Sequence, residues 1–322
     1  MTARPRTPQE VAEAVRRGAG LFRLEHRGLV AVAGADARRW LDGMVSGEVS
    51  ALAPEGPTRH CYAMLLTPIG RIVADLHVLA LPAGFLLELE REAVAAVLAR
   101  LERYVIADDV QLADATPEWV RMGLEGPAAP DVRARAWPAL AERGVVSAEY
   151  GWSGERAWQL FVPAAAAEAV RADLLEAGEA HGLVEAGLEA LEILRIESGT
   201  PRLGAELGEE VLPPEARLDH AVSTTKGCYT GQEVIARIRS RGQVKHLLVG
   251  LAFPGGTPPA PGDPIEAGGR RIGEVTSAAR SPRAGAIALG FVSRPHDAPG
   301  TEVRVAGRAA VVAALPFVEP GA

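Results

Sequence analysis

The chain has 322 residues, of which 48% are hydrophobic and 23% are charged, as in an ordinary soluble globular protein. This length predicts two or three domains. A formal net charge of −7 argues against a general nucleic-acid-binding protein, and no apolar run reaches the length of a membrane helix. The polar start MTARPRTPQE is not a signal peptide, so we expect a cytoplasmic protein.

The first predicted elements are a short helix and a pair of strands. Thr7-Pro8-Gln9-Glu10 has the pattern of a capping box, with proline at the first helical position, and Gly18 is a natural stop. Residues 21–32 alternate loosely around Gly28 and predict two strands that pair with each other.

Two apolar strands are predicted next, at 60–66 and 71–81, joined by a turn with proline and glycine. Asp75 and His77 lie inside the second strand, where such residues usually mark a solvated face. Cys61 lies inside the first strand, and we interpret it as core packing rather than a redox group.

The middle of the chain predicts helices that alternate with strands, which indicates an α+β fold. An amphipathic helix is expected at 90–104 and a strand at 105–112. A later helix carries leucines at helical spacing and ends at Gly199, which places Glu197 in its last turn. A carboxylate is unfavourable there against the helix dipole, so either a functional role or simple solvation of the side chain would explain it.

The densest chemistry lies in the segment Lys226–Glu233, with sequence KGCYTGQE. Its two glycines permit a tight, accessible turn, and Cys228 lies two residues from Lys226, whose charge would favour the reactive thiolate. The alternative is a structural turn with a buried cysteine. Residues 234–241 then predict a strand with Arg237, Arg239 and Arg241 on one face. Such a stripe could bind a polyanion or merely protect an exposed sheet edge.

The two cysteines, Cys61 and Cys228, stand far apart, and no C-x-x-C pair exists. We therefore expect no local metal site and no disulfide framework. After Leu247, evenly spaced short strands separated by Gly/Pro turns predict a small antiparallel barrel.

KGCYTGQEVIAR, followed by R-x-R-x-RG, resembles the signature of the YgfZ family. These are folate-binding proteins related to the glycine-cleavage T-protein (aminomethyltransferase) and implicated in maintaining iron–sulfur enzymes. LRIESG is similar to a T-protein stretch, and IGEVTSAARSP…AIALGFV resembles the T-protein C-terminal domain. The resemblance implies an α+β, T-protein-like ring of three domains around a central folate pocket. We expect these domains at 1–112, at 113–242 with the signature, and at 243–322 as an antiparallel β-barrel.

The resemblance also implies site residues. The carboxylate of Glu197 would grip the pterin ring through two hydrogen bonds. In T-proteins the matching hairpin ends in a pair of aspartates, one of which lies near the folate nitrogens. Ala74 and Asp75 stand where that pair would be, so one aspartate is missing. The arginine stripe would suit a polyglutamylated folate tail, with an RNA backbone as the lesser option. The predicted set is Cys228 as the catalytic residue and Glu197, Asp75, Lys226, Tyr229 and Arg237 as cofactor-binding residues.

Three functions fit these patterns. The favoured one is a tetrahydrofolate-binding protein that supports assembly or repair of iron–sulfur enzymes, with Cys228 as a redox-active thiol or transient cluster ligand. One cysteine cannot hold a cluster alone, so a client or assembly protein, or a small thiol, would supply other ligands. The second is a folate-dependent aminomethyltransferase or demethylase, against which Ala74 and Cys228 argue. The third is a non-catalytic module that keeps the folate fold. We expect a monomer.

Overall fold

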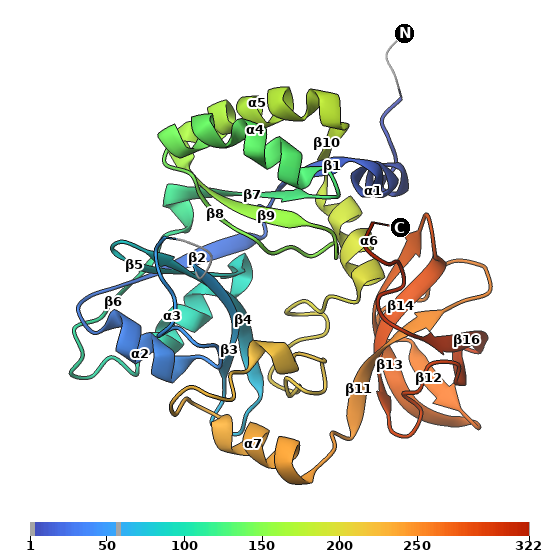
Figure 1. The fold of residues 1–322 in the computed structure, drawn as a ribbon. Helices are drawn as coiled ribbons and strands as arrows, with labels where there is room; N and C mark the ends of the chain where they lie inside the picture. Colours follow the sequence, from blue (N-terminus) through green and yellow to red (C-terminus); the bar gives the residue numbers. More distant parts are fainter. Residues whose placement is uncertain (1–3, 56–58, 322) are drawn as a thin grey trace. The chain divides into compact units, whose positions relative to one another are not determined.

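The computed structural model describes residues 4–55 and 59–321. The chain forms two compact units, each built from separate stretches of sequence (Figure 1). Unit 1 comprises the residues up to Leu24, Val120–Pro201 and the residues from His246 onward, and unit 2 comprises Glu25–Trp119 and Arg202–Lys245. The domain boundaries at 112 and 242 stay a prediction.

Unit 1 contains a five-stranded sheet with helices on both faces. The strand order is β10-β1-β7-β9-β8. The strands are β1 (Ala19–Arg23), β7 (Trp119–Glu125), β8 (Val146–Ala148), β9 (Ala157–Pro163) and β10 (Leu183–Ala186). Helices α4 (Ala129–Glu142) and α5 (Ala167–Gly178) bury their apolar residues with those of one sheet face. Helices α1 (Pro8–Arg17) and α6 (Leu188–Ser198) share a second core with Phe22, Leu24 and the barrel residues Leu248 and Leu289.

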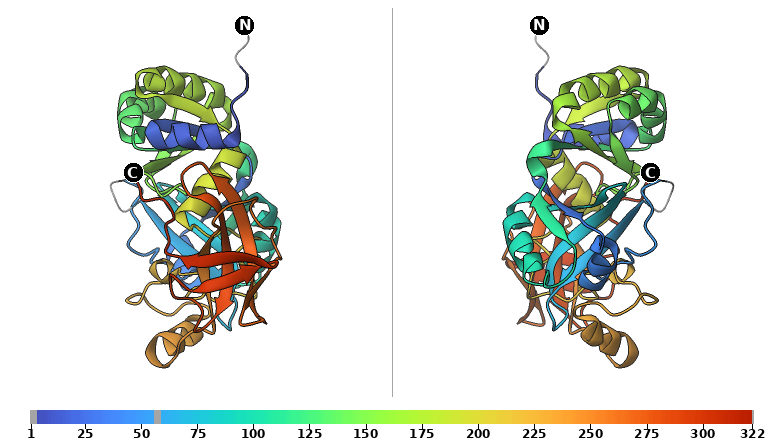
Figure 2. Two further views of the ribbon diagram at one scale, coloured as in Figure 1. Left: turned by 90° about the vertical axis from the view of Figure 1, so that its right-hand side faces the viewer. Right: turned by 90° about the vertical axis from the view of Figure 1, so that its left-hand side faces the viewer.

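The last part of unit 1 is a closed six-stranded barrel, visible in the left view of Figure 2. Its strand order is β11-β14-β13-β12-β15-β16. The strands are β11 (His246–Ala252), β12 (Pro264–Ala267), β13 (Arg270–Ser281), β14 (Gly285–Ser293), β15 (Glu302–Val305) and β16 (Arg308–Ala313). Alternate residues point inward and fill the barrel with aliphatic side chains, as small barrels require. The predicted antiparallel barrel is confirmed.

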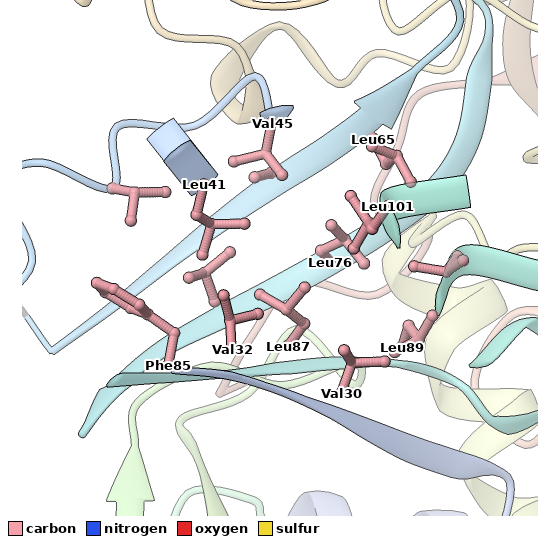
Figure 3. Close-up of a cluster of buried hydrophobic side chains, with 14 of the residues drawn as sticks. Val30, Val32, Leu41, Val45, Leu65, Leu76, Phe85, Leu87, Leu89 and Leu101 are labelled. Carbon is pink, nitrogen blue, oxygen red and sulfur yellow. The ribbon is translucent and has the colours of Figure 1, made fainter. Parts of the chain in front are cut away.

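Unit 2 is a five-stranded antiparallel sheet, of order β3-β4-β5-β2-β6, with two helices on one face. The strands are β2 (Arg27–Ala33), β3 (His60–Leu66), β4 (Ile72–Leu81), β5 (Gly84–Glu90) and β6 (Gln111–Asp114). Helices α2 (Ala37–Met44) and α3 (Val94–Glu102) cover this face. Leu41 and Leu101 meet Leu76, Leu87 and Val30 of the sheet there (Figure 3).

The remaining elements are short or lie near the signature segment. They are η1 (Arg91–Ala93), η2 (Thr116–Glu118), η3 (Ala164–Ala166), η4 (Glu179–His181), η5 (Asp219–Ala221) and α7 (Gln232–Arg241). Within the described ranges, no helix is long and apolar enough to cross a membrane.

Local signals at the ends of helices are confirmed. The Thr7 hydroxyl accepts a hydrogen bond from Glu10 N, and the Glu10 carboxylate accepts one from Thr7 N at 2.8 Å, which completes the predicted capping box. Helix α6 ends at Gly199, whose φ of +76° is a left-handed conformation that glycine adopts readily.

Three predictions about strands are wrong, one in the type of element, one in its extent and one in its pairing. Residues 234–241 form the helix α7, so Arg237, Arg239 and Arg241 do not share a strand face. In this short window VIARIRSR fits a helical period as well as an alternating one, and Ile235 is its buried residue. Of the strand expected at 105–112, only residues 111–112 are in a strand, as the first two residues of β6. The strands β1 and β2 do form, but each pairs in a different sheet rather than with the other.

Candidate functional site

The second face of the unit 2 sheet is polar, although its strands are largely buried. Successive side chains of a strand point to opposite faces. In β4, Ala74, Leu76 and Val78 enter the core beneath α2 and α3, so Asp75 and His77 point to the opposite face. The register aligns His77 with Tyr62 of β3 on one side and with Glu88 of β5 on the other. The other residues that share this face include His60, Met64, Glu90 and Arg27.

Asp75 is the centre of this polar face. Its side chain is almost fully buried, with 4% of the residue exposed. Tyr62 donates its phenolic hydrogen to Asp75 Oδ2 at 3.2 Å, whereas Asp75 Oδ1 has no hydrogen-bond partner among the described residues. Burial raises the pKa of Asp75, against an opposing effect of the Arg27 charge. A buried carboxyl oxygen without a partner costs free energy unless a ligand satisfies it.

Arg27 lies among the carboxylates of the same face. Its Nη1 donates to Glu90 Oε1 at 3.1 Å, and its Nε lies 3.5 Å from Glu88 Oε1. Burial raises the pKa of Glu90, and the charges of Arg27 and Arg202 lower it. Burial thus raises the pKa of both Asp75 and Glu90, against the opposing charge of Arg27, because a buried carboxylate loses its hydration.

Stacked rings fix the orientation of Tyr62. Its ring stacks on His77, with centroids 4.7 Å apart, and on His220 at 5.8 Å. His77 Nδ1 lies 2.9 Å from His60 Nε2, a hydrogen bond that needs one ring nitrogen to donate and the other to accept. Burial lowers the pKa of His60 to about 4, so this ring is neutral at pH 7. The stack holds the Tyr62 hydroxyl against Asp75.

The signature segment places its residues in different surroundings. The Lys226 side chain is 1% exposed, and its ammonium lies 5.5 Å from the centroid of the half-buried Tyr229 ring. Cys228 is exposed. Gly231 begins α7 with a φ of +85°, and a Cβ there would lie 2.6 Å from Thr67 O, so this position requires glycine. Arg237 lies on the exposed surface of α7.

The two thiols are expected to differ strongly in reactivity. Burial raises the pKa of Cys61 to about 12, so on the order of one thiol in 10⁴ is ionised at pH 8. Cys228 is exposed on its loop. We expect iodoacetamide to alkylate Cys228 at least ~100-fold faster than Cys61 under native conditions, as measured by mass spectrometry of each peptide. Equal, slow labelling of both thiols would contradict this expectation.

Glu197 lies in unit 1, inside a buried network rather than on a surface. Arg16 Nε of α1 donates to Glu197 Oε2 at 2.7 Å, and the Ser281 hydroxyl at the end of β13 donates to Glu197 Oε1. Arg16 Nη1 also donates to Glu155 Oε1 at 2.8 Å. Both carboxylate oxygens of Glu197 are therefore engaged within the chain, and a pterin would have to replace one of these contacts.

Sequence reasoning found Asp75 but missed the residues that surround it. Tyr62, Arg27, Glu88 and Glu90 become neighbours of Asp75 only through strand pairing. A signal was present, because polar residues alternate with apolar ones in HCYAMLL, IVADLHV and FLLELE. No group of three or more potential metal ligands comes together in the part of the chain that the structure describes.

The chain matches two family models in succession. The GCVT N-terminal domain covers residues 5–226, and the glycine cleavage T-protein C-terminal barrel domain covers residues 247–319. The chain is 35% identical to an aminomethyltransferase of Rubrobacter xylanophilus, over 95% of this chain and 84% of that protein. It is 32% identical to an aminomethyltransferase of Streptomyces coelicolor, over 98% of this chain and 91% of that protein.

The fold matches as well. A crystal structure of glycine cleavage system aminomethyltransferase T from Bartonella henselae superposes with a TM-score of 0.88 at 27% identity, covering 98% of this chain and 91% of that one. The two domain matches account for nearly all of the sequence, and the closed barrel coincides with the second. The chain therefore belongs to the glycine cleavage T-protein family.

Proposed function

We propose that this protein binds tetrahydrofolate at the polar face of the unit 2 sheet and acts as a folate-dependent aminomethyltransferase. The observation that carries the proposal is the buried Asp75 carboxyl, with one oxygen held by Tyr62 and the other without a partner among the described residues. The names of the relatives support the same activity.

The residues of this face suit a reduced pterin. Such a ring offers N–H donors, and Asp75 Oδ1 is a buried acceptor to which no described residue donates. When bound, tetrahydrofolate supplies the nitrogens that carry the one-carbon unit. Asp75 holds or releases a proton at Oδ1, which its raised pKa allows closer to neutral pH than for an ordinary aspartate. Tyr62 keeps the carboxyl in one orientation.

The other predicted ligands differ in how well their surroundings suit folate. Arg237 is exposed and could pair with the carboxylates of a polyglutamylated tail. Tyr229 offers a half-buried ring for packing. Glu197 and Lys226 are engaged within the chain, so we propose that they act through the elements they hold.

A second function is favoured by one observation, the exposure of Cys228. Free cysteine is usually buried, so an exposed thiol on the signature segment suits reaction with another molecule. This thiol, together with the YgfZ-like signature, supports a role in assembly or repair of iron–sulfur enzymes, with a client or assembly protein as partner. Under either function we propose a monomeric, cytoplasmic protein.

Assays of the glycine cleavage reaction separate the two functions. The purified chain replaces the T-protein of a reconstituted system, as wild type, as Asp75→Asn and as Cys228→Ser. The proposal predicts activity in the wild type, no change in Cys228→Ser, and a loss in Asp75→Asn. The second function is supported instead if the wild type is inactive in this assay and if, in cells, the iron–sulfur enzymes lose activity when Cys228 is replaced by serine.

A further inference from the structure

Lysine is rare in this chain. Of its 34 lysines and arginines, only Lys226 and Lys245 are lysines. Lys245 is exposed, whereas the Lys226 side chain is 1% exposed. An ammonium is compact and carries three donors, whereas a guanidinium is a planar fork that suits carboxylates and phosphates. In a chain that uses arginine almost everywhere, a buried lysine indicates a site shaped for an ammonium.

The site of the Lys226 ammonium lies where α2 ends. Lys226 Nζ donates to Asp42 O, to Val45 O at 3.0 Å and to Gly47 O at 2.6 Å. Three carbonyl oxygens thus take the three N–H groups. The carboxylate of Asp42 lies 3.3 Å away, and the carbonyl end of a helix favours a cation. Burial lowers the pKa of Lys226, with Asp42 acting in the opposite direction.

The segment 42–47 consists of the end of α2 and the turn that follows it, and we call it the 42–47 loop. It also binds the chain on both sides of Lys226. The hydroxyl of Ser46 donates to Ala221 O at 2.6 Å, and its carbonyl accepts from Ser223 N at 2.9 Å. Beyond Lys226, Thr230 N donates to Gly43 O at 3.3 Å. Between these anchors the tip at 227–228 is exposed, and a Cβ at Gly227 would meet no atom of the described residues within 4 Å.

We propose that Lys226 is a positioning residue. Its ammonium fastens the signature segment to the 42–47 loop, a contact set that we name the Lys226 clasp, and so holds Cys228 on a fixed, exposed tip. The clasp restricts the motion of the segment that carries Cys228, and so orients the thiol for reaction with another molecule. This inference goes beyond the proposed function, because it concerns the loop and requires no folate.

The accessibility of the Cys61 thiol shows whether the clasp is closed. The Lys226 charge acts on the Cys61 thiol, and a Cβ at position 47 would lie only 3.2 Å from Cys61 Sγ. The 42–47 loop therefore covers this thiol. Opening of the clasp should expose Cys61 without unfolding the rest of unit 2, as a local rather than a global event.

The first test compares the native-state alkylation of Cys61 in Lys226→Met with that in Lys245→Met, the same substitution at the other lysine. We expect Lys226→Met to raise the rate at least ~10-fold with little dependence on low concentrations of urea, and Lys245→Met to match the wild type. Lys226→Arg should also raise the rate, because a planar guanidinium does not match three converging carbonyls. If Lys226→Met does not fold, Lys226→Gln replaces it.

The second test reads the position of Cys228 directly. A nitroxide is attached to Cys228 in a Cys61→Ala background, and its mobility is measured by electron paramagnetic resonance. The clasp predicts a slow component in the parent and in Lys245→Met, and a shift to fast motion in Lys226→Met. Unchanged spectra, full rescue by Lys226→Arg, or exposure of Cys61 only with the urea dependence of global unfolding would each overturn the proposal.

Discussion

Asp75→Asn is expected to slow aminomethyl transfer by about 10²–10⁴-fold, the usual contribution of a positioned general acid or base. Asparagine keeps an oxygen that can accept the Tyr62 hydrogen bond, but it cannot exchange a proton at Oδ1. Measurement of kcat and KM in the glycine cleavage assay distinguishes loss of chemistry from loss of binding. The control is Asp131→Asn, an exposed aspartate of unit 1. A variant with wild-type kcat would show that Asp75 does not take part in proton transfer.

The same substitution should stabilise the fold as the pH rises. Burial raises the pKa of Asp75 above its ordinary value of 3.8. At a pH between 3.8 and the raised pKa, the unfolded chain has therefore lost a proton that the folded chain keeps. Wild-type stability therefore falls with rising pH in that window, whereas the asparagine variant has no such group. We expect the stability advantage of Asp75→Asn over the wild type to grow as the pH rises above 3.8 and to level off above the raised pKa.

Urea denaturation of the wild type and of Asp75→Asn at several pH values measures this difference. Asp131→Asn, at an exposed position, is the control for the substitution itself. An Asp75→Asn variant that loses stability relative to the wild type as the pH rises would show that this carboxylate is favourably paired when charged. In that case its free oxygen would not be the unsatisfied group on which the proposed folate contact depends.

Arg16→Met is expected to destabilise unit 1 by about 3–5 kcal/mol, because it leaves the buried carboxylates of Glu197 and Glu155 without their cation. The contacts join α1, α6 and the segment before β9, so the loss should appear in the main unfolding transition. Chemical denaturation followed by circular dichroism measures it. Arg17→Met is the control on the same helix, and it should change stability by less than about 0.5 kcal/mol because Arg17 is exposed.

A double variant separates packing from charge. Glu197→Gln removes one of the two carboxylates that Arg16 neutralises, so the combination with Arg16→Met should recover part of the lost stability. Additive losses in the double variant would mean that the pair is not coupled and that Glu197 has another reason to be buried. That result would support the contact with the pterin ring that is predicted for Glu197.

Elements with local signals could be predicted from the sequence. The capping box at Thr7–Glu10 and the glycine end of α6 depend on a few neighbouring residues. The barrel could be predicted because its strands alternate strongly and are separated by Gly/Pro turns. The pattern does not distinguish a strand from a helix at 234–241, because the eight residues VIARIRSR fit both periods; in the structure they form part of α7, with Ile235 buried.

The site itself depends on contacts that sequence proximity does not reveal. Asp75 contacts Tyr62, and the charge of Arg27 acts on it, because β3, β4, β5 and β2 pair in a particular order. The Lys226 clasp joins residues about 180 positions apart in the chain, at 42–47 and 226. Motif resemblance identified Asp75, Glu197 and Lys226 as important, but it could not tell a ligand-facing group from one that holds the structure together.

The central claim is that tetrahydrofolate binds at the polar sheet face around Asp75. The most direct test is an anaerobic calorimetric titration of tetrahydrofolate into the wild type, Asp75→Asn, Glu197→Gln and Asp131→Asn. We predict micromolar binding by the wild type and by Asp131→Asn, and at least ~10-fold weaker binding by Asp75→Asn, equivalent to about 1.4 kcal/mol. Absence of binding by the wild type, or equal affinity in Asp75→Asn, would contradict the claim.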